Sequence, residues 1–82
     1  MLRLLLISGD ALRSETTLKR RILKFTGSRR ATRAILTRIE HARRVGRVVS
    51  LAISPTRADA QEADDWDVSA SYAGSLTARR AS

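Results

Sequence analysis

The chain of 82 residues has no cysteine, one proline, one histidine and three aromatic residues. Without cysteine it forms no disulfide and offers no thiolate as nucleophile or metal ligand. Gly9 follows an apolar run, but the lysine and further glycines of a phosphate-binding loop are missing. No pair of acids and no Ser/His/Asp set has the pattern of a catalytic site, and His41 lacks a second ligand beside it. We therefore expect a protein that is not an enzyme and that holds no metal or cofactor.

Long apolar runs are also missing. The run at residues 4–7 is far shorter than the ~20 residues that cross a bilayer. It is also shorter than the apolar core of a secretory signal, which needs about 7–15 residues. We therefore expect a cytoplasmic protein without membrane contact. A single domain of this length is marginally stable, and a homodimer is one way to bury more surface.

Acidic residues are scarce in the first part of the chain. Residues 1–47 hold eleven Arg and two Lys against three acids, a balance of +10. Residues 48–82 hold three Arg against five acids, a balance of −2, which gives +8 for the chain. A basic half of this strength attracts polyanions. The excess of fourteen Arg over two Lys has two open explanations, a function in binding and the codon usage of a GC-rich genome.

Residues 28–47 carry the strongest helical pattern and seven of the sixteen basic residues. Ser28 is a favourable N-cap, and Gly46 stands where a left-handed C-cap residue is expected. The predicted buried stripe consists of Ala31, Ala34, Ile35, Ile39, Ala42 and Val45. The predicted exposed face is basic and consists of Arg29, Arg30, Arg33, Arg43, Arg44 and Arg47.

The stretch before this helix predicts a strand and a first helix. Residues 1–8 are apolar on both faces, which is typical of a central strand, although a helical start is the competing interpretation. A helix follows to about Phe25, capped by Asp10 or by Ser14, and Gly27 ends it. Its predicted buried stripe is Ala11, Leu18, Ile22 and Phe25. Its predicted basic face is Arg13, Arg20, Arg21 and Lys24.

After Gly46 the apolar period changes to two. Residues 47–54 place Val49, Leu51 and Ile53 on one face, and Pro55 stops the strand. Residues 66–73 alternate again, so the two strands are expected to pair antiparallel through a long loop. The predicted fold is α+β: strand-helix-helix-strand-strand, a three-stranded antiparallel sheet with both helices on one face. It forms one domain, residues 1–74, followed by a flexible basic tail, residues 75–82.

Two charged features leave alternatives open. Arg38 lies inside the apolar arc of its helix, where it snorkels to the edge, pairs with an acid such as Glu15, or meets a partner. Residues 56–65 form an acidic loop, for which we expect a solvated segment that balances the basic helices. Alternatively, the loop binds a divalent cation, or it folds over the basic face of this copy or another. The carboxylates of this region are Asp59, Glu62, Asp64, Asp65 and Asp67.

The two helices and their Thr-Gly-Ser link resemble a helix-turn-helix in topology and charge. The resemblance covers residues 10–73 and implies that Arg29, Arg30 and Arg33, in the first turns of the second helix, touch DNA beside a β-hairpin wing. Residues 2–45 also resemble ribbon-helix-helix repressors, in which the strand pairs with its twin in a dimer and reads the major groove. That resemblance implies that Arg3 is the side chain that contacts bases in the major groove.

The preferred hypothesis is a small basic module that binds duplex nucleic acid, mainly at the phosphate backbone. Ser28 and the arginines after it suit an anion at a helix N-terminus. The alternative is an adaptor or inhibitor of the phage or plasmid type that docks its basic face on an acidic partner protein. A homo-oligomeric structural piece, or a translated frame with little selected function, is the third possibility. The predicted binding residues are Arg13, Arg20, Arg21, Lys24, Ser28, Arg29, Arg30, Arg33, Arg43, Arg44 and Arg47.

Overall fold

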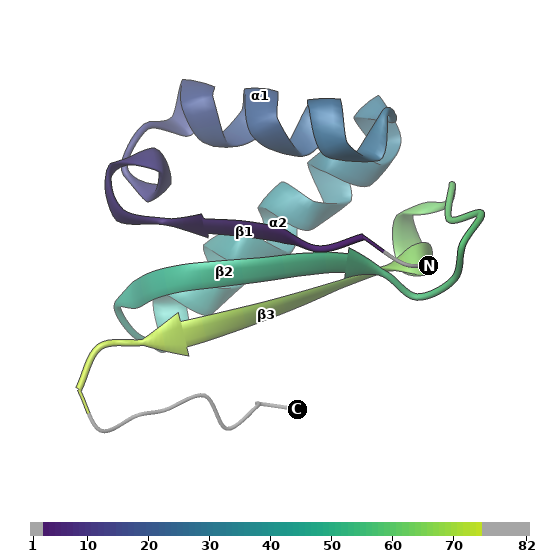
Figure 1. Cartoon of the computed structure of the whole chain (residues 1–82). Coiled ribbons are helices and arrows are strands. Elements are labelled where there is room, and N and C mark those ends of the chain that lie inside the picture. The colour runs from purple at the N-terminus through teal and green to yellow at the C-terminus, as the bar shows by residue number, and fades with distance from the viewer. Residues whose placement is uncertain (1–2, 75–82) are drawn as a thin grey trace.

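The computed structural model describes residues 3–74, and the predicted order of elements is confirmed (Figure 1). The tail predicted at residues 75–82 lies outside the described residues. The strands are β1 (Leu5–Ser8), β2 (Val48–Pro55) and β3 (Trp66–Tyr72). The helices are α1 (Glu15–Thr26) and α2 (Arg29–Val45), with the short 3-10 turns η1 (Gly9–Leu12) and η2 (Ala63–Asp65).

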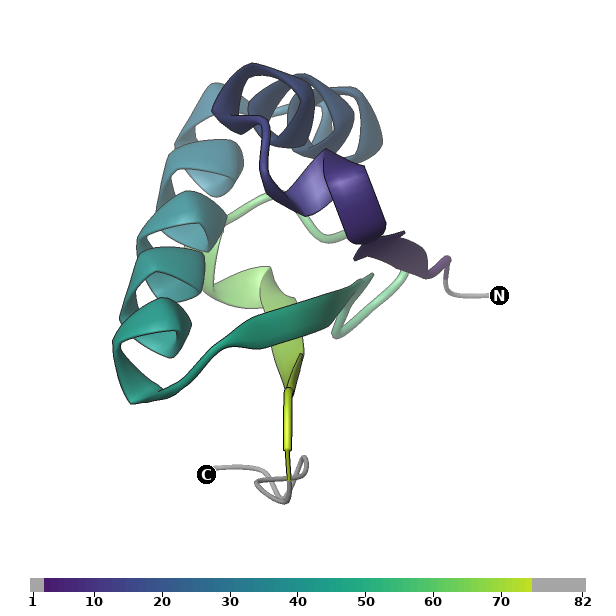
Figure 2. The same cartoon turned by 90° about the vertical axis from the view of Figure 1, so that its left-hand side faces the viewer.

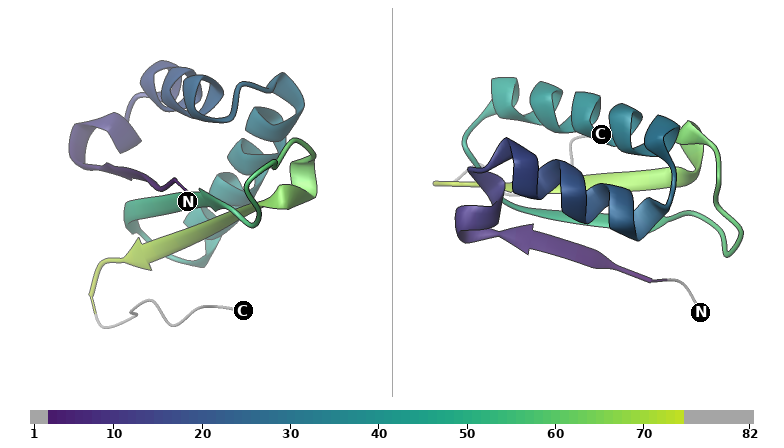
Figure 3. Two further views of the ribbon diagram at one scale, coloured as in Figure 1. Left: turned by 45° about the vertical axis from the view of Figure 1, so that its right-hand side comes forward. Right: turned by 90° about the horizontal axis from the view of Figure 1, so that it is seen from above.

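The three strands form one antiparallel sheet in the order β1-β2-β3. Leu5 lies opposite Ile53, and Ile53 lies opposite Val68 on the other side. Both helices cover the same face of the sheet, as predicted, and the opposite face is left open by the described elements (Figures 2 and 3). The prediction that the first strand is central is wrong: β2 is central, because both its neighbours pair with it, and β1 is an edge strand.

The core lies between the sheet and the two helices. Trp66 is 3 % exposed and meets Phe25 edge-on, with ring centroids 5.6 Å apart. Of the apolar stripe predicted for α2, Ala31, Ile35 and Ile39 are buried, Ala34 and Ala42 are half-buried, and Val45 is 58 % exposed. Val45 stands ten residues after Ile35, so it is rotated about 80° from the core direction at 100° per residue. The largest fully buried side chains are Ile7, Leu18, Ile22, Ile35, Ile39, Leu51 and Ile53.

The helix ends decide between the predicted caps. Ser14, not Asp10, caps α1, since its Oγ accepts from the backbone N–H of Thr17 at 3.2 Å. Gly27 ends α1 in the left-handed region with φ 68°. The left-handed conformation predicted for Gly46 is wrong, because its φ of −175° is extended and leads the chain directly from α2 into β2.

A β-bulge changes which side chains of β2 face the core. Leu51 and Ile53 are buried as predicted, but Val49 is 42 % exposed. The register shifts between Val48 and Ser50, so Val48 packs against the core in its place. Pro55 is the last residue of β2, and the strand ends there as predicted.

None of the helices within residues 3–74 has the length and apolar character needed to cross a bilayer.

Candidate nucleic-acid interface

The link between the two helices is held by a small hydroxyl network. Ser28 Oγ accepts from the backbone N–H of Ala31 at 3.1 Å and so caps α2, as predicted. Thr32 is buried, and its Oγ1 donates to the carbonyl of Ser28 at 2.8 Å. The hydroxyl of Thr26 lies 3.1 Å from that of Thr32 and accepts from the N–H of Ser28. These bonds tie the end of α1 to the first turn of α2, which fixes the position of the arginines that follow.

A groove runs between α1 and α2, and we call it the helical groove. Its volume is about 510 Å³, and its lining is Lys19, Leu23, Arg29, Thr32, Arg33 and Leu36. Lys19 comes from α1, while Arg29 and Arg33 stand four residues apart and so share one side of α2. All three cations are exposed, and no carboxylate within residues 3–74 pairs with any of them. Three positive side chains therefore converge on a partly apolar hollow.

The other flank of α2 faces the acidic loop. A second hollow there is lined by Arg29, Arg30, Arg33, Ala34, Thr37 and Ala63. Arg30 reaches Glu62 at 4.0 Å, with both side chains well exposed, so this ion pair is weak. Arg29 and Arg33 border both hollows and form the crest between them.

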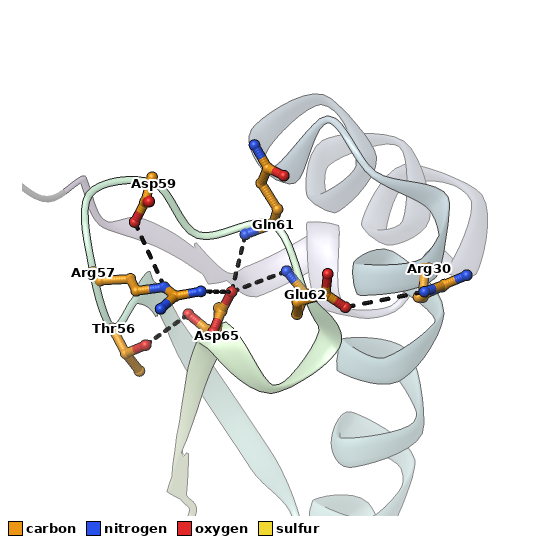
Figure 4. A network of polar contacts seen from close by, with 7 residues as sticks. All are labelled: Arg30, Thr56, Arg57, Asp59, Gln61, Glu62 and Asp65. Carbon is orange, nitrogen blue, oxygen red and sulfur yellow. Dashed lines mark hydrogen bonds and ion pairs between the residues drawn. The ribbon is translucent and has the colours of Figure 1, made fainter.

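The acidic loop is ordered around the carboxylate of Asp65 (Figure 4). This carboxylate accepts from the backbone N–H groups of Glu62 at 3.0 Å and Gln61 at 3.1 Å, and from Arg57 at 3.2 Å. The two backbone bonds, led by that from Glu62, hold the pKa of Asp65 below its usual range, with help from Arg57. Partial burial of the carboxylate opposes this shift. The loop is thus a shaped element seated beside α2, and among the described residues its ion pair with the predicted basic face is that of Glu62 with Arg30.

Arg38 joins α2 to the same region. Its Nη1 donates to the carbonyl of Trp66, and its Nη2 lies 4.0 Å from Asp64. The acid that Arg38 meets is therefore Asp64, not the suggested Glu15. Within the described residues Asp64 and Glu62 draw two arginines of α2 toward the loop, and Arg29 and Arg33 are left facing outward.

The predicted basic residues of α1 lie on more than one side of that helix. Lys19 lines the groove, although it was not among the binding residues predicted from the sequence. Arg21 is rotated about 160° from Lys19 on the helix and Lys24 about 140°, so both lie on the flank away from α2. Arg20 lies between these two sides, and Arg13 precedes α1 at the end far from Ser28. A helical wheel that counted Leu23 as facing α2 could have identified Lys19.

At the other end of α2 the predicted cations have different surroundings. Arg43 Nη2 donates to the carbonyl of Leu12 at 2.5 Å, which tethers α2 to η1. Arg44 and Arg47 are exposed and have no ion-pair partner within residues 3–74. The predicted binding residues therefore fall into three groups. Arg29 and Arg33 line the helical groove, Arg43 ties α2 to η1, and the others are dispersed over the surface.

Comparison with protein-family models, curated proteins and solved structures found no match for this chain. Its chemistry must be judged from its own side chains. Within residues 3–74 no three His, Cys, Asp or Glu side chains come close enough together to hold a metal ion. The helical groove, lined by ammonium and guanidinium groups, suits an anion.

Proposed function

We propose that this protein binds duplex nucleic acid through phosphate contacts made at the helical groove. The observation that supports this is the convergence of Lys19, Arg29 and Arg33 on one hollow without a carboxylate partner among the described residues. Guanidinium groups fork phosphate oxygens, and ammonium groups attract them as point charges. The N-terminal turn of α2 adds a partial positive charge beside the same arginines.

The distribution of aromatic side chains favours duplex over single-stranded nucleic acid. Proteins that bind single strands stack bases on exposed aromatic rings. Trp66 is buried, Phe25 packs against the core and Tyr72 is half-buried in β3. Contact with the phosphate backbone needs no such rings, and its affinity falls steeply as salt rises.

Fluorescence anisotropy of a labelled DNA duplex, titrated across a salt series, tests the proposal. The test variant replaces the three groove cations: Lys19→Gln, Arg29→Gln and Arg33→Gln. The control removes the same charge away from the groove: Arg13→Gln, Arg21→Gln and Lys24→Gln. Each phosphate contact on duplex DNA contributes about 0.9 to the log–log salt slope. We therefore expect the groove variant to lose about 2 to 3 units of slope and the control to lose much less.

Two outcomes contradict the proposal. Equal losses in the two variants mean that total charge, and not the groove, governs binding. No binding of the unaltered protein at low salt removes nucleic acid as the target.

A second candidate is an acidic partner protein. Leu23 and Leu36 line the helical groove between its cations, and such a hollow also fits an amphipathic helix with acidic flanks. A stoichiometric complex with one protein, together with absent DNA binding, selects this candidate. Loss of that complex in the groove variant then assigns it to the same surface.

A further inference from the structure

The only usual protection of the outer edge of β1 is that this strand is short, with four residues. Longer edge strands carry a charge, a proline or a bulge that discourages pairing with another chain. The residues of β1, Leu5–Ser8, include neither a charge nor a proline, and the register with β2 is regular. Seen from the helix side, β1 borders the sheet and no described element lies beyond it (Figure 3, right).

Two leucines beside this edge are unusually exposed. Leu6 is 64 % exposed and Leu4 is 59 % exposed. Leu6 lies opposite Ala52, which lies opposite Ser69, so it belongs to the sheet face that the helices leave open. The inward residues of β1, by contrast, are Leu5, which packs against the core, and Ile7, which is fully buried. One copy thus buries only one side of an apolar strand.

The outward side of β1 is apolar but uncovered in one copy. Strands that are apolar on both faces are typical of sheets whose two faces are both covered. Within residues 3–74 of one copy, β1 has a strand neighbour only on the side of β2. A strand added at this edge does not cover the open face, but it gives Leu4 and Leu6 apolar cross-strand neighbours there.

We propose that β1 pairs antiparallel with β1 of a second copy, so that two sheets join into one of six strands. The register with Leu5 opposite Leu5 of the other copy sets Leu4 opposite Leu6 at both ends of the seam. Cross-strand apolar pairs of this kind stabilise a sheet. Leu4 and Leu6 of one copy thus face Leu6 and Leu4 of the other across a twofold axis. This self-complementarity points to a second copy as the partner at this edge.

Charge does not oppose contact at the seam itself. Arg3, the nearest described cation in sequence, is exposed but turns toward α1: its Nη2 donates to the carbonyl of Phe25 at 3.2 Å, and its guanidinium lies 4.9 Å from the Phe25 ring centroid. The twofold axis of an antiparallel strand pair stands perpendicular to the sheet. Both helical layers therefore lie on the same side of the joined sheet, and the two basic surfaces face the same direction.

The molar mass in solution, from light scattering after gel filtration, tests this proposal without any ligand. We expect twice the 9.1 kDa of one chain for the unaltered protein. Leu6→Lys places a charge on the seam and should return the mass to one chain. Ser69→Lys, on the same open face but on β3, is the matched control and should remain dimeric. Melting followed by circular dichroism verifies that both variants are folded.

Cysteine cross-linking tests the register, since the chain has no cysteine of its own. Opposed residues of an antiparallel pair have Cα atoms about 4.5–5.5 Å apart, which a disulfide can bridge. An oxidised mixture of Leu4→Cys and Leu6→Cys should therefore give a mixed dimer in higher yield than either variant alone.

A one-chain mass for the unaltered protein, or a dimer that persists in folded Leu6→Lys, overturns the proposal. Absence of the mixed disulfide overturns the register. Each of these results is independent of nucleic-acid binding.

Discussion

At the scale of single residues, polar side chains that touch the backbone shape this protein more than ion pairs do. Asp65 holds two backbone N–H groups, and Arg38 and Arg43 donate to carbonyls in other elements. The ion pairs of Arg30 and Arg38 with the acidic loop are long and largely exposed, so each contributes little. The two partners of each contact lie between 3 and 31 residues apart in sequence. Only the short-range contacts can be predicted from the sequence pattern.

The carboxylate of Asp65 should make stability depend on acid pH. Because its pKa is lowered on folding, the stabilisation is present above the unfolded value of about 3.9 and is lost as the pH falls through the lower folded value. Asp65→Asn keeps the shape and removes the charge. We expect urea unfolding at neutral pH to show a less stable variant, and the gap to the unaltered protein to close in acid below about pH 3.9. A gap that stays constant with pH contradicts this role.

Arg43 should contribute to stability and its neighbour Arg44 should not. Arg43→Met keeps an apolar stem but removes the donor to the Leu12 carbonyl, which costs about 1 kcal/mol of unfolding free energy. Arg44→Met removes the same charge from an exposed position without an ion-pair partner among the described residues, and we expect a change near zero. Urea denaturation of the two variants gives the comparison. Equal destabilisation rules out the tether.

At the scale of elements, the acidic loop and α2 act as a pair. The hydrogen bonds around Asp65 shape residues 56–65, and η2 rests against the first half of α2 (Figure 4). Glu62 and Asp64 then compete with any external anion for Arg30 and Arg38. Alternation in the sequence predicted the two strands that flank this loop, but not the helix against which the loop rests. The position of the loop depends on the β2–β3 register, because the pairing of Pro55 with Trp66 sets where residues 56–65 leave and re-enter the sheet.

Removing the two loop charges should strengthen duplex binding. Glu62→Gln with Asp64→Asn frees Arg30 and Arg38, and we expect affinity at low salt to rise roughly two- to tenfold. The control, Asp10→Asn with Asp67→Asn, changes the net charge equally at positions without an ion pair in the described part of the chain. Anisotropy titrations compare the two. A rise of the same size in the control assigns the effect to net charge alone.

At the scale of the whole molecule, the helices present the basic surface and the opposite sheet face is nearly uncharged. The outward residues of the sheet are mainly Ser and Ala with Leu6 and Val49, and Asp67 is the charged residue among them. Under the two proposals, this separation would let one side bind a polyanion while an edge of the sheet meets another copy.

The proposed dimer should strengthen with salt. Two chains of net charge +8 repel each other at long range, whereas the β1 seam is apolar. The Debye length falls from about 10 Å at 0.1 M to about 3 Å at 1 M, so repulsion fades while apolar burial persists. Sedimentation equilibrium at the two salt concentrations should show tighter association at the higher one. Weaker association at high salt indicates an interface held by charge, which is not the one proposed.

The sequence by itself determined the order of the elements, the caps at Ser28 and Gly27 and most of the buried stripes. These features follow from local conformational preference and from the period of apolar residues, which act over one or two turns. Only the tertiary structure decided that β1 lies at an edge, that a bulge turns Val49 outward and that Lys19 joins Arg29 and Arg33 at one groove. The physical reason is that strand order, register and helix rotation minimise the free energy of the whole packed core. No local pattern of residues contains that information.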